Sequence, residues 1–106
     1  MTNDPPVLIL ISLSSGPKHG YALMQDIEGF AGVQLGPGSL YGAISRLEER
    51  GLIRPLAPAG RSRPYELTAA GRAALESVIA GMRVLIDTGT ARLARSPRPA
   101  LRGGTA

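Results

Sequence analysis

The chain has 106 residues, of which 43% are hydrophobic and 4% aromatic, and it contains neither cysteine nor tryptophan. This length suits one compact domain and leaves little chain for a large catalytic cleft. The lack of cysteine excludes disulfide bonds, a thiolate nucleophile and cysteine metal sites. Twelve basic residues face eight acidic ones, which gives a net charge of +4. Such an excess suits a polyanion such as nucleic acid, although a solvated arginine-rich surface also keeps small domains soluble.

The longest strongly apolar run, residues 7–13, is too short to cross a bilayer. No basic stretch precedes this run and no small-residue cleavage site follows it, so we expect neither a membrane span nor a signal peptide. The sequence therefore predicts a soluble protein of the cytoplasm.

The first predicted element starts at the two prolines of residues 5–6, because proline is tolerated in the first turn of a helix. Residues 7–13 are apolar on nearly every side, a pattern that fits either a buried strand or a buried helix. We expect this element to end at the turn residues 14–17.

Helical periodicity is clear in the second predicted element. Its polar face carries Asp26 and Glu28, and this acidity makes that face unsuited to phosphates. Gly29 and Gly32 are expected to end the helix. The predicted apolar face consists of Tyr21, Leu23, Met24, Ile27 and Phe30.

The third predicted helix begins at Pro37, directly after Gly36, and ends at Gly51. A helix that hides an apolar stripe and presents a slim polar amino-terminal end is shaped to enter a groove of DNA. Taken alone, the segment is more typical of an ordinary surface helix with weak helix formers. The apolar stripe consists of Leu40, Ala43, Ile44 and Leu47. The slim polar side consists of Gly38, Ser39, Gly42, Ser45 and Arg46.

Two short extended runs, residues 52–56 and 64–67, predict a β-hairpin. Arg61 and Arg63 lie at the tip of its loop, where they can rest on a DNA backbone or in the minor groove. The plainest interpretation is a solvated turn, but the neighbouring Gly60 and the lack of nearby acidic residues favour DNA contact. An isolated hairpin is only marginally stable, so this one must pack against the preceding helices.

Thr68 is a favourable N-cap for a last helix whose apolar pattern continues for about 25 residues, or about 38 Å. This stripe, which ends at Leu93, is longer than a small three-helix core can cover. We therefore expect the same helix of a second copy to cover the rest, and to offset the weakening by internal glycines. The expected dimerisation surface consists of Leu8, Ile11, Leu75, Val78, Ile79, Met82, Leu85 and Ile86.

Three segments in succession carry a family resemblance. They are residues 19–23 (HGYAL), residues 36–53 (which begin GPGSLY and end RLEERGLI) and residues 63–72 (RPYELTAAGR). With these separations, residues 7–75 resemble the PadR family of winged helix-turn-helix transcriptional regulators, in its short subgroup with a single carboxy-terminal dimerisation helix. The resemblance implies a mainly α-helical fold with a small β-hairpin wing.

The expected domain organisation follows from this resemblance. It implies a winged helix-turn-helix DNA-binding domain at residues 1–68 and a dimerisation helix at residues 69–95. Residues 96–106 are rich in proline, arginine and glycine, and we predict a disordered basic tail there.

The resemblance also implies a dimeric DNA-binding repressor, often released by a small aromatic or amphipathic effector. The start of the second helix suits a phosphate, although a lone histidine such as His19 is more often structural. Tyr41 can pack sideways against the second helix or direct its hydroxyl to a phosphate, and the resemblance favours the DNA role. Arg46 can reach a guanine or a phosphate. The expected DNA-binding residues are Lys18, His19, Tyr21, Pro37, Gly38, Ser39, Tyr41, Gly42, Ser45, Arg46, Arg61 and Arg63.

The chain departs from the family pattern in three places. Gly36 stands where a serine or threonine cap is common, and Gly42 stands in place of a proline, which should loosen the third helix. The last helix has no aromatic residue, so the pocket in which short family members stack flat drugs is not carried over. Ordinary dimer packing is favoured over an aliphatic effector pocket at the dimer interface. Such a pocket would be lined by Leu8, Ile11, Met82 and Ile86.

These observations favour a homodimer that places two recognition helices in successive major grooves about 34 Å apart, on a palindromic operator. Binding should weaken steeply with salt, because arginine contacts to phosphates release counterions. The alternative is a winged-helix protein interaction module without DNA function, indicated by Glu48 and Glu49 at the far end of the third helix. The sequence has no nucleophile–base pair, metal-spaced cluster or phosphate-loop glycine pattern, so we expect neither an enzyme nor a cofactor.

Overall fold

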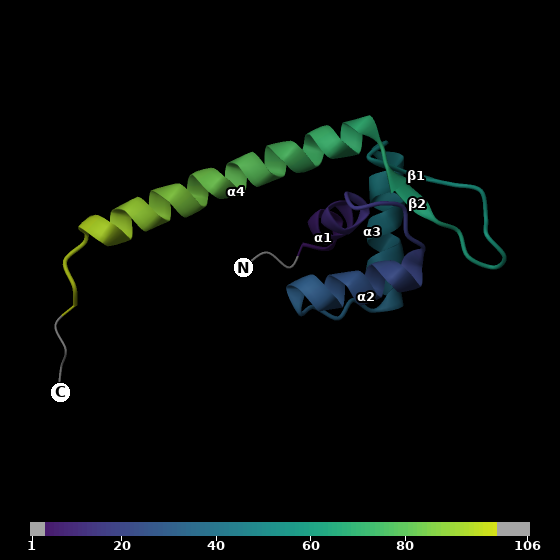
Figure 1. The fold of residues 1–106 in the computed structure, drawn as a ribbon, viewed down its shortest axis with the longest axis horizontal. Coiled ribbons are helices and arrows are strands. Elements are labelled where there is room, and N and C mark those ends of the chain that lie inside the picture. Colours follow the sequence, from purple (N-terminus) through teal and green to yellow (C-terminus); the bar gives the residue numbers. More distant parts are fainter. Residues whose placement is uncertain (1–3, 100–106) are drawn as a thin grey trace.

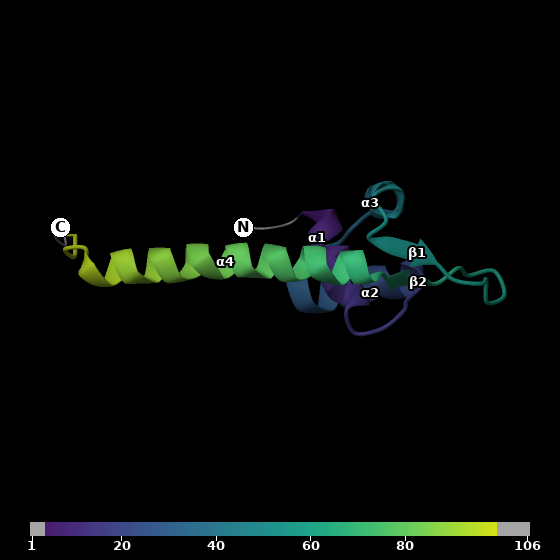
Figure 2. The ribbon, with the colours of Figure 1, turned by 90° about the horizontal axis from the view of Figure 1, so that it is seen from above.

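The computed structural model describes residues 4–99. Three short helices and a two-stranded hairpin form a compact unit, and one long helix extends away from it (Figures 1 and 2). This confirms the predicted fold class, mainly helical with a small wing. Residues 100–106 of the predicted basic tail lie outside the described part of the chain. In chain order the elements are α1 (Pro5–Leu13), α2 (Gly20–Ala31), α3 (Pro37–Glu49), β1 (Ile53–Pro55), β2 (Tyr65–Leu67) and α4 (Ala69–Arg95).

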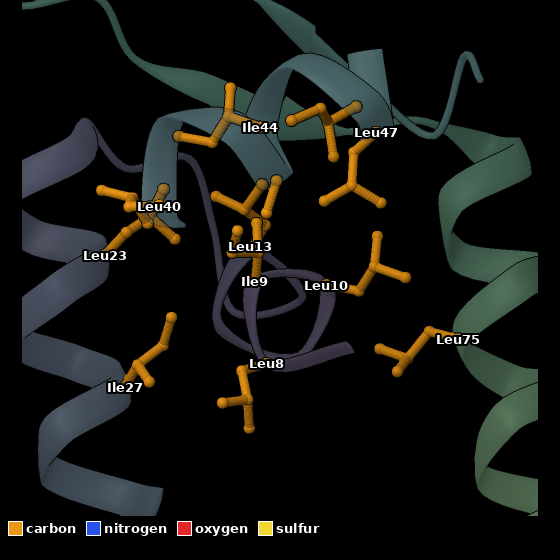
Figure 3. Close-up of a cluster of buried hydrophobic side chains, with 12 residues drawn as sticks. Leu8, Ile9, Leu10, Leu13, Leu23, Ile27, Leu40, Ile44, Leu47 and Leu75 are labelled. Carbon is orange, nitrogen blue, oxygen red and sulfur yellow. The ribbon is translucent and has the colours of Figure 1, made fainter. Parts of the chain in front are cut away.

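The apolar run near the amino terminus forms the helix α1, which settles the choice between strand and helix. A helix that is apolar on all sides has to be buried on all sides. Figure 3 shows α1 with α2 and α4 on either side and α3 across it, and Leu10 directed toward α4. Ile9 is fully buried and Leu13 nearly so. The core is therefore built around α1.

Helix α2 differs from its prediction in two respects. Gly29 lies inside the helix, which continues to Ala31 and ends at Gly32 in the left-handed conformation. Tyr21 and Phe30 are 62% and 46% exposed and do not belong to the buried face. At about 100° per residue, Tyr21 is turned about 160° away from the buried Leu23, and Phe30 lies in the last turn, at the edge of the core.

The two strands of the wing pair antiparallel. Ile53 lies opposite Leu67, and Pro55 lies opposite Tyr65. The predicted runs are confirmed, although the strands are shorter. Ile53 is buried in the core, and all three residues of the second strand are half-buried. The wing is thus held by the helices, as its small size requires.

Helix α4 begins as predicted, with the Thr68 hydroxyl accepting a hydrogen bond from the Gly71 N–H at 3.0 Å. The same hydroxyl donates to the carbonyl oxygen of Gly51 at 2.7 Å. The backbone N–H of Thr68 donates to the Leu52 carbonyl oxygen at 3.1 Å. Three hydrogen bonds therefore fix the first turn of α4, two of them against the chain that enters the wing.

Two of the residues predicted for the dimer surface are instead buried inside one protomer. Leu8 is 4% exposed and Leu75 is 6% exposed, and both belong to the core. The reason is that the first turns of α4 pack on α1, so the apolar stripe of α4 serves the core before it reaches solvent. Leu8 consequently cannot line the effector pocket considered above. Ile79 and Ile86 remain exposed.

Gly71 is required where α4 passes the chain entering the wing. A Cβ added there would lie 1.9 Å from the carbonyl oxygen of Leu52, and a backbone atom cannot yield as a flexible side chain does. We expect Gly71→Ala to lower the free energy of unfolding by about 2 kcal/mol in urea denaturation. The control is Gly81→Ala in the same helix, where a Cβ meets nothing within 4 Å, and it should stabilise by up to about 1 kcal/mol. Equal stabilities for the two variants would contradict this account of the junction.

Candidate nucleic-acid interface

The exposed side of α3 is slim at its amino-terminal end, as predicted. Leu40, Ile44 and Leu47 hold the opposite side in the core, each no more than 2% exposed. Gly36 supplies no side-chain cap, so the first N–H groups of the helix keep no side-chain acceptor. The residues on the free side are Gly38, Ser39, Ser45 and Arg46, all exposed, and the half-buried Gly42.

A cleft of about 470 Å³ lies between the start of α2, helix α3 and the wing loop. The structure brings together residues that are widely separated in the sequence, and the side chains offer imidazole, phenol and guanidinium groups. Polar donors of this kind suit the oxygen atoms of a phosphate. Five predicted DNA-binding residues line the cleft: His19, Tyr21, Tyr41, Arg61 and Arg63.

Tyr41 packs sideways against the second helix, one of the two arrangements considered from the sequence. A Cβ added at Gly20 would lie 2.2 Å from the Tyr41 hydroxyl oxygen and 2.8 Å from the ring carbon that bears it. Only glycine at the start of α2 leaves room for this phenol. The Tyr41 side chain is nevertheless 48% exposed, so its hydroxyl lies beside α2 and at the wall of the cleft. Packing and a phosphate contact are compatible in this geometry.

Tyr65 lies at the wing side of the same cleft. Burial raises the pKa of Tyr65 above that of an ordinary tyrosine, Glu48 and Tyr41 raise it further, and Arg63 opposes them. The phenol consequently stays protonated and neutral at physiological pH, where it can donate a hydrogen bond and does not repel an anion.

His19 is the N-cap of α2. Its Nδ1 accepts a hydrogen bond from the Ala22 N–H at 3.4 Å. This supports the structural interpretation of the lone histidine, because one ring nitrogen serves the helix. The rest of the imidazole still faces the cleft.

Lys18 does not have the position expected of a phosphate ligand. Its ammonium donates to the carbonyl oxygen of Ser12, to the Ser15 hydroxyl at 2.8 Å and to the Gly16 carbonyl oxygen at 3.4 Å. Its side chain is 19% exposed. The last carbonyl groups of α1 lack intrahelical donors, and the lysine satisfies one of them. These contacts give Lys18 a role within the fold, and its contact with DNA stays a prediction.

Three residues that line the cleft were missed from the sequence. Gly20 and Ser62 have side chains too small to signal a function, and Tyr65 resembled a half-buried strand residue. Their common signal is proximity in the sequence, since each lies within two residues of a predicted contact residue. The close approach of Gly20 and Tyr41 required the structure.

Residues 4–99 show the features of neither a membrane-spanning helix nor a metal site. None of the helices there is long and apolar enough to cross a membrane. No group of three or more histidine, aspartate or glutamate residues in that range is arranged to bind a metal ion. Among the predicted DNA-binding residues, the fold gathers polar side chains on the free side of α3 and around the cleft.

Comparison with known families decides the class of this molecule. Residues 9–77 match the transcriptional regulator PadR-like family. The chain belongs to this family. This match confirms the resemblance drawn from the three segments. The family consists of transcriptional regulators and not of enzymes.

Solved structures share this fold, and a curated protein shares the sequence over most of the chain. A PadR family transcription regulator from Clostridium difficile superposes with a TM-score of 0.76 at 22% identity, covering 84% of this chain and 97% of that one. A PadR family transcriptional regulator from Eggerthella lenta gives 0.70 at 29% identity, covering 86% and 84%. An uncharacterized 37.1 kDa protein in transposon Tn4556 of Streptomyces fradiae is 56% identical over 75 residues. Those residues are 71% of this PadR-like chain and 22% of that protein, so the chain spans about a fifth of its length.

The contact between Gly20 and Tyr41 can be tested by a double-mutant cycle. We expect Gly20→Ala to destabilise the protein by about 1 kcal/mol, because the added methyl group displaces the phenol. In a Tyr41→Ala background the same change should cost much less, a coupling of about 1 kcal/mol. Urea denaturation of the four proteins measures both values. Equal costs in the two backgrounds would place the phenol elsewhere.

Proposed function

We propose that this PadR-like regulator is a homodimeric repressor that binds a palindromic operator in the cytoplasm. The observation that carries the proposal is the uncovered amino-terminal end of α3 beside a cleft that two wing arginines line. These two features supply the two parts of operator binding, contact with base edges and contact with the phosphate backbone.

In this proposal α3 enters the major groove. Ser39 and Ser45 are exposed on its slim side, where small hydroxyl side chains can approach base edges. Arg46 is exposed directly after Ser45, within reach of a guanine or a phosphate. The buried face of α3 fixes the helix on the core, so its exposed side would contact the base edges in a fixed orientation.

In the same proposal, the cleft binds the DNA phosphate backbone that borders the major groove. Arg61 and Arg63 are both exposed on the wing loop, and the structure gives neither an acidic partner among the described residues. By contrast, Arg54 on β1 is paired with Glu66 across the wing. The loop arginines are therefore the free cations of the wing among the described residues, and the Tyr65 phenol at the cleft wall adds a neutral donor.

The exposed stripe of α4 supports a second copy as partner. At about 100° per residue, Ile79, Met82, Ile86 and Leu93 lie within about 40° of Leu75 on the helix surface. Ile86 and Leu93 are 63% and 76% exposed in one protomer. Apolar side chains in a continuous row of this length are unfavourable in water, and the same row on a second copy covers both.

Repression and release by an effector follow from the family resemblance. An effector bound between the copies would contact aliphatic side chains of α4 such as Met82 and Ile86, because α4 has no aromatic residue. The interaction-module alternative rests on Glu48 and Glu49, which lie at the carboxyl end of α3. That position leaves the groove-facing end near Ser39 free, and favours the DNA proposal.

Removing the two wing arginines should weaken binding to all DNA sequences alike. Each phosphate contact contributes about 0.9 to the slope of log affinity against log salt. The dimer carries four wing arginines, so Arg61→Ala with Arg63→Ala should reduce that slope by about 3.6. Fluorescence anisotropy at several salt concentrations measures it. Ser39→Ala supplies the contrast, because it should change sequence preference and leave the slope intact. An unchanged slope in the double variant would remove the wing from the interface.

A matched pair of substitutions tests the dimer. Ile86 and Val84 are 63% and 62% exposed, but Val84 lies about 180° from Leu75 and therefore off the stripe. Ile86→Glu should shift the protein toward monomer in sedimentation velocity at micromolar concentration, because it places a charge in the apolar contact. Val84→Glu should leave the dimer intact. Dissociation by both variants, or by neither, would contradict the proposed surface.

A further inference from the structure

Lys18 lies at the point where three parts of the fold meet. Its ammonium donates to the Ser12 carbonyl oxygen and the Ser15 hydroxyl at the carboxyl end of α1. Its Nζ is 4.0 Å from a carboxylate oxygen of Asp26 on α2. The last turn of α1 has no basic residue of its own, so the lysine brings the cation that this helix end favours.

A buried hydroxyl strengthens the same link. Ser12 is 1% exposed, and its hydroxyl donates to the Asp26 carboxylate at 2.6 Å. Asp26 thus accepts from α1 and faces the ammonium of Lys18. Burial of a serine hydroxyl is favourable only with such a partner, so this small network ties α1 to α2 in one arrangement.

The backbone of Lys18 continues the link into the wing. Its N–H donates to the Tyr65 carbonyl oxygen at 3.1 Å, and the Tyr65 N–H donates to the Lys18 carbonyl oxygen at 3.0 Å. His19, the next residue, caps α2. Arg63 is two residues before Tyr65. The arginine loop is consequently connected to the helices through the backbone of Lys18.

We propose that Lys18 is a positioning residue that sets the place of the wing arginines relative to α3, and that it makes no phosphate contact itself. The inference rests on the proposed DNA-binding function. Its ammonium fixes the turn between α1 and α2, and the paired backbone of that turn fixes β2. Without the ammonium the turn keeps its hydrogen bonds from Ser15 and Gly16 to α1 but loses the charged link that also faces Asp26. The position of the wing relative to α2 is then less firmly fixed.

The salt dependence of DNA binding separates positioning from contact. Lys18→Met keeps the length of the side chain and removes the ammonium. We expect operator affinity to fall on the order of tenfold, the effect of losing a charge-assisted hydrogen bond, with the slope of log affinity against log salt unchanged. A phosphate ligand would instead lower the slope by about 1.8, because the dimer carries two copies of Lys18. The assay is run at a temperature where circular dichroism shows each variant fully folded.

Two further variants make the test decisive. Asp26→Asn loosens the same network and keeps every cation, so it should also lower affinity without changing the slope. Arg92→Met removes one charge from the far end of α4 and should change neither quantity. Amide hydrogen exchange should be faster at the Tyr65 N–H in both network variants, a local effect that general destabilisation does not single out.

Each remaining outcome has a distinct meaning. A reduced slope for Lys18→Met, or wild-type affinity for both network variants, overturns the positioning role. If Lys18→Met does not fold, Asp26→Asn decides. Failure of the wild-type protein to bind DNA, or an unchanged slope on loss of Arg61 and Arg63, would instead contradict the proposed function.

Discussion

The packing of three helices on α1 is the constraint on which the other features depend. A helix without a polar face is stable in water only when its neighbours cover it completely, and each fully buried leucine or isoleucine side chain contributes about 1.5–3 kcal/mol. Ile9 and Leu13 are covered in this way. Because α3 commits its apolar face to this core, its slim face has to point outward. The orientation of the candidate recognition helix is thus a consequence of burial.

Two glycines allow the close contacts that position α3 beside α2 and α4 beside the chain entering the wing. Gly20 lets the Tyr41 phenol lie against the first turn of α2, and Gly71 lets α4 pass over the Leu52 carbonyl group. Both are close approaches, since a Cβ at either position would overlap another atom. The first sets α3 beside α2, and the second sets the direction in which α4 leaves the core.

Periodic patterns predicted α3 and α4 with their caps. Where the sequence has no periodic pattern, only the structure revealed the conformation and surroundings of the residues. Residues 7–13 could not be distinguished as strand or helix, since both are buried on all sides. Gly29 was wrong as a helix end because an exposed glycine inside a helix costs only about 1 kcal/mol. Leu75 was assigned to the dimer because a stripe does not reveal what covers it. Lys18 shows the same limit, since a charge in the sequence does not reveal which helix end it reaches.

The anchoring of α4 connects the two halves of the proposed function. The helix has 27 residues, about 40 Å, and it is continuous from Thr68 to Ser96. Its first turns are fixed to the core through Leu75, while the exposed part of the stripe starts at Ile79. Because one helix carries both contacts, a second copy that packs on the stripe also sets the separation of the two α3 helices. In the proposed dimer, the spacing of the operator half-sites would then depend on the close approach at Gly71, which no DNA contact involves.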